Sequence, residues 1–102
     1  DGLAMSSRNA YLSPEERTHA TVLYRSLQHA RELYGAGQND ARTVREAAVA
    51  MIRSAPGAVI DYVEIVDPVT LQPLGTIVPG AVMALAVKFG RTRLIDNMVI
   101  AG

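Results

Sequence analysis

Cysteine and tryptophan are both absent from the 102 residues. Without cysteine the chain has neither a disulfide framework nor a thiolate metal site. No apolar run approaches the roughly twenty residues that a membrane-spanning helix needs, and the N-terminus lacks the charged-then-apolar order of a signal peptide. The sequence therefore predicts a soluble, cytoplasmic protein that has no membrane partner.

Neither sign of charge is in excess. Ten basic residues stand against ten acidic ones, and neither sign gathers into a long run. Duplex nucleic acid and anionic membranes both select a basic stripe, so we expect no nucleic-acid partner.

Histidine is scarce as well, with only His19 and His29 present. They lie ten residues apart on one predicted helix, whereas a helical metal pair uses spacings of three or four residues. We predict no metal site held by this chain and interpret both histidines as surface or boundary residues.

Hydrophobic residues make up 49% of the sequence, enough for one domain spanning residues 1–102. A helix is expected from Pro14 to about Tyr34, because Ser13 is a good N-cap, proline suits the first helical position and Glu16 follows the cap by three. Gly35 is the expected C-cap. The apolar positions that recur at helical spacing are Ala20, Val22, Leu23, Leu27, Ala30, Leu33 and Tyr34.

A second helix is predicted from a cap at Asp40 to about Arg53. Its core-facing positions are Ala41, Val44, Ala48, Met51 and Ile52. Two successive amphipathic helices each offer one apolar stripe, and a sheet is the surface that we expect them to share.

The second half of the chain supplies three strands. Residues 59–66 are rich in β-branched side chains, residues 81–89 are apolar on both faces and suit a central strand, and residues 93–100 follow a hairpin turn at 90–92. Pro68 and Pro73 confine the intervening segment to a turn. The predicted fold class is α+β, with two helices packed on a three-stranded antiparallel sheet.

The first dozen residues have a different character, being small, rich in hydroxyls and close to a helix start. Backbone N–H groups, two serine hydroxyls and the Arg8 guanidinium could all meet one anion. The same residues also suit an ordinary polar turn, and spacing alone leaves both interpretations open.

Residues 1–12, DGLAMSSRNAYL, resemble the signature that opens the C-terminal domain of the pantothenate synthetase (pantoate–β-alanine ligase) family. Two later segments, DYVEI at 61–65 and GRTRLIDN at 90–97, are similar to family segments in the expected order and spacing. The resemblance covers the whole chain. It implies the C-terminal lid domain of a nucleotidylyl-transferase-like enzyme, whose Rossmann-like N-terminal domain is absent from this chain.

The resemblance also implies roles for the loop. It corresponds to the family segment that contacts ATP phosphates, a counterpart of the KMSKS loop of related nucleotidylyl transferases. The ATP-binding residues implied are Met5, Ser6, Ser7 and Arg8, of which Ser6, Ser7 and Arg8 would be catalytic. The loop has no lysine, so Arg8 is its only cation, and the remaining charge would come from Mg²⁺ and from the absent domain. Asn9 is interpreted as a turn former.

The implied activity is ATP-dependent condensation of pantoate with β-alanine to pantothenate, a coenzyme A precursor, through a pantoyl adenylate with release of pyrophosphate and AMP. Pantoate, β-alanine, ATP and the enzyme's own N-terminal domain are the implied partners, and the family implies a homodimer. This chain alone is predicted to be inactive. The alternatives are a stand-alone protein-interaction module and a related adenylate-forming enzyme that uses another acid.

Other polar residues are interpreted structurally. Asp61 and Glu64 are expected on opposite faces of their strand and so form no carboxylate pair. In the segment that holds Arg91, Arg93, Asp96 and Asn97, we expect hydrogen bonds at a turn and a strand end instead of contacts to substrate.

Overall fold

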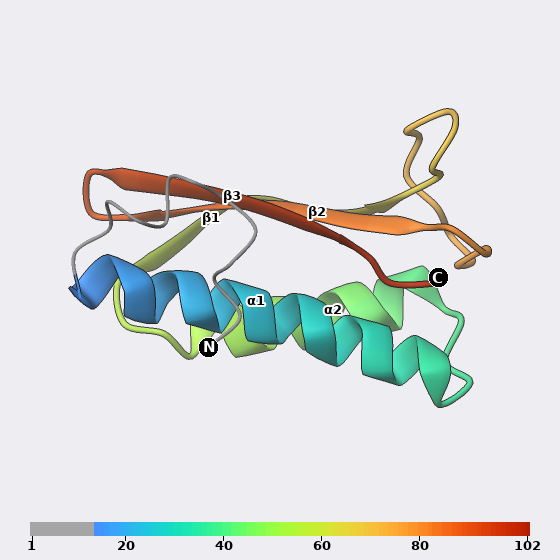
Figure 1. The fold of residues 1–102 in the computed structure, drawn as a ribbon, viewed down its shortest axis with the longest axis horizontal. Coiled ribbons are helices and arrows are strands. Elements are labelled where there is room, and N and C mark those ends of the chain that lie inside the picture. The colour runs from blue at the N-terminus through green and yellow to red at the C-terminus, as the bar shows by residue number, and fades with distance from the viewer. Residues whose placement is uncertain (1–13) are drawn as a thin grey trace.

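The computed structural model describes residues 14–102. Within them, two helices are followed by three strands: α1 (Pro14–Gly35), α2 (Ala41–Arg53), β1 (Ala58–Val66), β2 (Val82–Phe89) and β3 (Thr92–Val99). Figure 1 shows both helices lying side by side against one face of the sheet. The predicted α+β class, with two helices on a three-stranded sheet, is confirmed.

The helix ends follow local chemistry. The Asp40 carboxylate accepts the Thr43 backbone N–H at 3.0 Å, as an N-cap should. α1 ends one residue later than predicted, at Gly35, and the capping glycine lies two residues later: Gly35 is still helical, and the residue with a positive φ, 105°, is Gly37. The Gly37 N–H donates to the Tyr34 carbonyl there.

The sheet is antiparallel with the order β1-β2-β3, so β2 is the central strand, as predicted. Phe89 pairs with Thr92 around a two-residue turn. Gly90 takes the first central position of that turn at φ 64°, which suits a type II′ hairpin and favours glycine.

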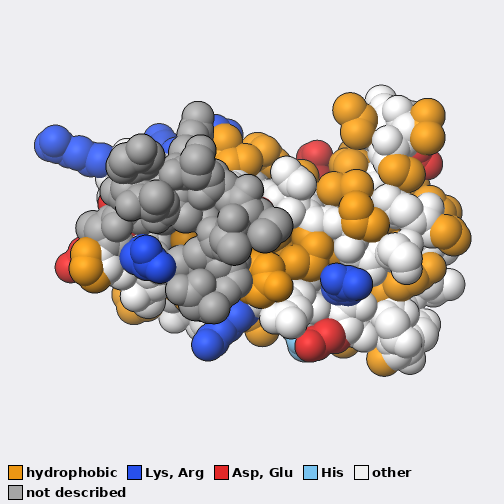
Figure 2. Space-filling view, viewed as in Figure 1, with side chains coloured by type: hydrophobic (Ala, Val, Ile, Leu, Met, Phe, Trp, Pro, Cys, Tyr) orange, Lys and Arg blue, Asp and Glu red, His pale blue; other side chains and the backbone are white. Residues whose placement is uncertain are grey.

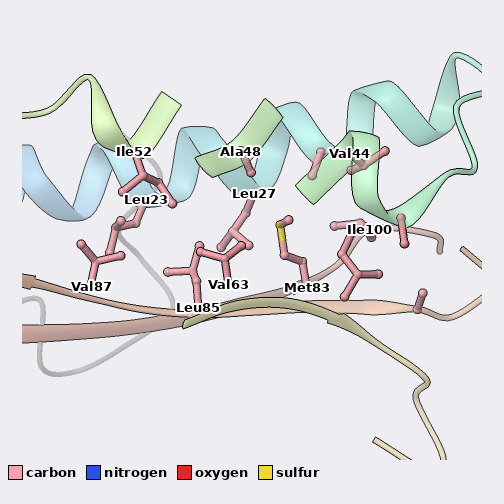
Figure 3. Packing of buried hydrophobic residues seen from close by; sticks show 14 of the residues in the cluster. Leu23, Leu27, Val44, Ala48, Ile52, Val63, Met83, Leu85, Val87 and Ile100 are labelled. Carbon is pink, nitrogen blue, oxygen red and sulfur yellow. The ribbon is translucent and has the colours of Figure 1, made fainter. Parts of the chain in front are cut away.

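The core lies between the helices and the inner face of the sheet (Figure 3). Its members share near-complete burial: Leu23, Leu27, Val44, Ala48, Ile52, Val63, Met83, Leu85, Val87 and Ile100. The apolar stripes predicted on both helices supply the helical side of this core, with one exception: Met51, predicted to face the core, is only half-buried and lies outside the cluster.

Residues 67–81 connect β1 to β2 and also brace α2. The Ala41 N–H donates to the Gly75 carbonyl at 3.0 Å, and the Ile77 N–H donates to the Asn39 carbonyl at 2.8 Å. None of the helices in the part of the chain from residue 14 onward is long and apolar enough to cross a membrane.

Candidate functional site

The four residues predicted to contact ATP, Met5, Ser6, Ser7 and Arg8, lie outside the described residues, as does Asn9. The structure describes the chain from Pro14, in the first turn of α1. The start of α1 therefore holds the described residues that are nearest to that segment in the sequence.

The first turns of α1 are attached to the β2–β3 hairpin by two side-chain contacts. The Thr92 hydroxyl donates to the Glu16 carboxylate at 2.8 Å. One turn later, the His19 ring stacks on Phe89, with ring centroids 3.9 Å apart and planes 6° from parallel. His19 is half-buried, in agreement with its interpretation as a boundary residue. These contacts hold the helix start against the end of the sheet.

The outer face of the sheet, the face turned away from both helices, carries no helix within residues 14–102. Its side chains include three large hydrophobic residues that are substantially exposed: Val59 at 62%, Ile95 at 52% and Val99 at 47%. The outward positions of the central strand are Val82, Ala84, Ala86 and Lys88, so small side chains lie in its middle and a lysine near the hairpin. The outer face is thus shallow and partly apolar.

One ion pair crosses this outer face. Arg93 Nε lies 2.9 Å from Asp61 Oδ2, and both side chains are roughly half exposed, at 41% and 49%. Arg93 alternates along β3 with Leu94, which packs against the core, so Arg93 points outward. The pair ties β1 to β3 across the central strand.

The expectation that Asp61 and Glu64 face opposite ways is wrong. A β-bulge interrupts the β1–β2 register between Ile60 and Tyr62, so Asp61 has no partner on β2. The bulge adds one residue to β1 and shifts the alternation, leaving both carboxylates exposed. The Asp61 carboxylate is paired with Arg93, so Asp61 and Glu64 still form no catalytic carboxylate pair.

Asp96 lies on the other side of β3 from Arg93 and is half-buried, as the odd spacing between them predicts. Burial raises the pKa of its carboxyl, while the hydrogen bond that its Oδ1 accepts from the Asn97 N–H at 2.8 Å acts in the opposite direction. The Asp96 side chain thus bonds to the backbone of Asn97, its neighbour in β3, which supports the structural interpretation of these two residues.

The loop of residues 67–74 stands on the side of the sheet away from the helices (Figure 1). The Asp67 carboxylate accepts N–H groups from Val69 at 2.8 Å and Thr70 at 2.9 Å, and these bonds lower the pKa of Asp67. Val69 and Leu71 are 86% and 67% exposed, and Figure 2 shows hydrophobic side chains on this projection. The loop is internally bonded yet presents apolar side chains to solvent.

A cleft of about 230 Å³ lies between the start of α2, β1 and residues 73–75. Both arginines in its walls are engaged: the Arg45 Nε donates to the Val63 carbonyl, and the Arg42 Nε lies 3.4 Å from a Glu46 carboxylate oxygen. Glu64 is the third charged residue that lines the cleft. The residues described here gather no group of three or more His, Asp or Glu side chains that could hold a metal ion.

Sequence reasoning missed the contacts at the start of α1. Glu16 was interpreted only as a member of a capping box, and Thr92 only as part of a turn. The two residues are 76 positions apart, and no local pattern signals a hydrogen bond over that separation. The bulge at Asp61 also leaves no clear mark in the sequence.

Comparison with known proteins shows which family the chain is similar to. The family model described as pantoate-beta-alanine ligase matches residues 1–99. The pantothenate synthetase of Koribacter versatilis is 52% identical over 100 residues, covering 98% of this chain and 34% of that protein. The pantothenate synthetase of Pelotomaculum thermopropionicum is 54% identical, covering 98% of this chain and 36% of that protein.

Solved structures show the same similarity to pantothenate synthetase. The crystal structure of pantothenate synthetase from Thermus thermophilus superimposes with a TM-score of 0.86 at 44% identity, covering 99% of this chain and 36% of that one. The chain therefore spans about a third of the length of the relatives that it matches.

Proposed function

The chain belongs to the pantoate–β-alanine ligase family, and from that premise we propose that it forms the C-terminal lid domain of an ATP-dependent ligase that makes pantothenate. The observation that carries the proposal is the family match over residues 1–99, which includes the segment from Met5 to Arg8. The longer enzyme would act in the cytoplasm as a homodimer, and its N-terminal part would be a Rossmann-like domain.

In the proposed first step, a carboxylate oxygen of pantoate attacks the α-phosphorus of ATP. The bond from that phosphorus to the bridging oxygen breaks, and pyrophosphate leaves. Negative charge grows on the phosphate oxygens as this happens, and a positioned cation lowers the barrier. Arg8 would supply that cation, while Ser6, Ser7 and the backbone of Met5 would donate hydrogen bonds or shape the loop.

In the second step, the amine of β-alanine attacks the carbonyl carbon of the pantoyl adenylate. The mixed anhydride bond breaks, AMP leaves, and the amine loses a proton to give the amide. An acyl adenylate is hydrolysed easily, so a lid that excludes water would protect it. Mg²⁺ bound to the ATP phosphates would supply screening of their charge, and among the described residues no group of three or more acidic or histidine side chains gathers to hold it.

The outer face of the sheet is the described surface best suited to meet the rest of the enzyme. Both helices cover the inner face, whereas the outer face exposes Val59, Ile95 and Val99. A sheet face that no helix covers and that carries exposed apolar side chains is a candidate interaction surface. We propose that this face turns toward the N-terminal domain when the lid closes.

The decisive experiment measures AMP release by the full-length protein in the presence of ATP, pantoate and β-alanine. Arg8→Ala should lower kcat by about a hundredfold or more, as loss of a transition-state phosphate contact does. Arg91→Ala is the matched control, because Arg91 is an exposed arginine without a hydrogen bond or ion pair in the described part of the chain. It should retain wild-type kcat.

Three results would count against the proposal. Unchanged activity of Arg8→Ala would remove the assigned role of the loop. Release of AMP with other acids but not with pantoate would favour a related adenylate-forming enzyme. Substantial pantothenate formation by the 102-residue chain alone would contradict its role as a lid, since it would then need no second domain.

A further inference from the structure

The two most exposed large hydrophobic side chains among residues 14–102 lie close together on one loop. Val69 is 86% exposed and Leu71 is 67% exposed, more than any such residue on the outer face of the sheet. Both belong to the 67–74 loop, which projects on the side of the sheet away from the helices (Figure 1). Single exposed hydrophobic residues are common, but two on one projection, beside a partly apolar sheet face, form a candidate contact surface.

The 67–74 loop is held in one shape by hydrogen bonds of its own. The Asp67 N–H donates to the Gln72 carbonyl and the Asp67 carbonyl accepts the Leu71 N–H, both at 2.9 Å. The Asp67 carboxylate accepts two further N–H groups within the loop. At its base Pro68 packs close to Gly80, where an added Cβ would lie 3.2 Å from the Pro68 Cγ. A loop that is already ordered loses little conformational entropy when it binds.

Leu71 adopts its conformation at an energetic cost. Its φ of 61° lies in the left-handed region, which disfavours a branched side chain such as leucine. The strain does not bring Leu71 into the core, because its side chain is exposed and lies outside the core cluster. Strained residues are commonly retained where they serve a contact or a site. The conformation thus points a leucine outward with no gain to the packing of this domain.

The size of the apolar contact indicates the kind of partner that it suits. Two aliphatic side chains bury roughly 200 Å² between them. A stable interface between separate molecules needs upward of about 1,000 Å², so these two residues alone would not hold a second copy of the chain. A domain of the same polypeptide needs less area, because the covalent link keeps it at about millimolar effective concentration. The chain spans about a third of the length of its relatives, so a linked domain is the partner indicated.

We propose that Val69 and Leu71 of the 67–74 loop pack on an apolar surface of the N-terminal domain in the full-length enzyme, where they help to hold the lid closed. The loop and the outer face of the sheet lie on the same side of this domain, so one partner can meet both (Figure 1). The inference rests on the proposed function, because its partner is the N-terminal domain named there.

Hydroxyl-radical footprinting of the wild-type full-length protein tests the contact directly, because covered side chains react more slowly than exposed ones. The exposures of Val69 and Leu71 predict high reactivity if the loop stays in solvent. We expect low reactivity instead, with a further decrease when ATP and pantoate are added and no change when the protein is diluted. Met51 is the internal reference, because it lies on α2, which covers the other face of the sheet. Its reactivity should be the same with and without substrates.

Variants of the full-length protein test whether the contact matters for activity. Leu71→Asn removes the apolar side chain and keeps the loop conformation, since asparagine tolerates a positive φ. It should lower kcat/KM for ATP by about three- to tenfold, the effect of losing one apolar side-chain contact in the closed state. Val69→Ser should lower it as well. Leu71→Met should keep wild-type kinetics, because methionine supplies an apolar side chain of similar volume.

Gln72→Ala is the matched control within the same loop. Gln72 is exposed, and the hydrogen bonds described for it involve only its backbone N–H and carbonyl. Its substitution therefore changes a polar side chain of the loop without touching the apolar pair or the loop conformation. It should leave kcat/KM for ATP at the wild-type value.

The outcomes separate this contact from the proposed function. If pantothenate is formed while Val69 and Leu71 react as exposed side chains and Leu71→Asn has wild-type kinetics, the contact is wrong and the proposed function stands. Protection that disappears on dilution also overturns it, because the occupant would then be a second copy. If wild type makes no pantothenate, the proposed function fails, but protection at every protein concentration would still support a contact with the linked domain. The absence of both would end both proposals.

Discussion

At the residue scale, Asp40 shows how one side chain starts a helix. Its carboxylate accepts both the backbone N–H of Thr43 and the Thr43 hydroxyl. These bonds favour the ionised form, the side-chain bond most of all, so the pKa of Asp40 is lowered from its ordinary value. The cap therefore couples the stability of α2 to pH.

Replacement of this cap should destabilise the 102-residue chain in a pH-dependent way. A carboxyl whose folded-state pKa lies below its unfolded value stabilises the fold above about pH 3.9, and this contribution is lost as the pH falls through the folded pKa. We expect Asp40→Ala to lower Tm by several degrees at pH 7, and the deficit should become smaller as the pH falls through the folded-state pKa of Asp40, because only the charge-dependent part of the cap is then lost. Thermal unfolding followed by circular dichroism from pH 2 to 7 measures it.

Asp40→Asn is the control, because asparagine is a good N-cap but does not titrate. It should lose much less stability than Asp40→Ala at pH 7. A deficit of Asp40→Ala that stays constant across the whole pH range would show that the carboxylate charge plays no part.

Leu71 is a second informative residue. It is the one non-glycine residue with a positive φ, 61°, among residues 14–102, and its side chain is 67% exposed. The left-handed region costs an L-residue roughly 1–2 kcal/mol relative to glycine. Little packing is lost when so exposed a side chain is removed, so the strain should decide the effect of substitution.

We therefore expect Leu71→Gly to leave the free energy of unfolding unchanged or to raise it by up to about 1 kcal/mol, although glycine usually destabilises. Urea denaturation of the 102-residue chain measures the change. Val69→Gly is the matched comparison, since Val69 is even more exposed, lacks a positive φ and should lose stability on substitution. A larger loss for Leu71→Gly than for Val69→Gly would contradict this account.

At the scale of elements, the sequence was informative wherever structure depends on neighbouring residues. Asp40 and Arg53 bound α2 within a residue of the prediction, and the doubly apolar segment became the central strand β2. The signals were a cap, a 3.6-residue period and β-branched composition, all of them local. The C-cap of α1 was predicted at Gly35 but lies at Gly37, because both glycines permit a stop and only the second adopts a positive φ.

Features that depend on distant residues were not predictable. The bulge at Asp61 is supported by Arg93 on another strand, and the start of α1 by Thr92, 76 positions from Glu16. The candidate site is the opposite case, because Ser6, Ser7 and Arg8 were predicted from a local sequence motif alone. Their roles remain predictions, because they lie outside the described residues.

At the scale of the whole molecule, activity should respond differently to a positive charge added on the outer face of the sheet and to one added on the solvent side of the helices. Ile95 lies on the outer face and is 52% exposed. Ile95→Lys should change the free energy of unfolding of the 102-residue chain by less than about 1 kcal/mol, because surface substitutions usually cost little. In the full-length enzyme it should lower kcat/KM for ATP by about tenfold or more, since a lysine would be placed in the proposed contact with the N-terminal domain.

Ala50→Lys serves as the control, because Ala50 is exposed on the solvent side of α2. It introduces the same charge on the opposite side of the molecule and should leave both stability and activity nearly unchanged. If Ile95→Lys has full activity as well, the outer face does not meet the rest of the enzyme when the lid closes.

The segment that follows β1, residues 67–74, also affects the exposed edge of the sheet. β1 is an edge strand, and open edges invite pairing with strands of other molecules. Here the Arg45 guanidinium occupies the Val63 carbonyl, the Leu74 N–H donates to the Ile65 carbonyl at 2.9 Å, and Pro73 forms a bridge with Val66. Proline offers no N–H for a further partner. The segment that displays hydrophobic side chains to solvent thus also covers the C-terminal half of the β1 edge, which disfavours strand addition at that part of the sheet.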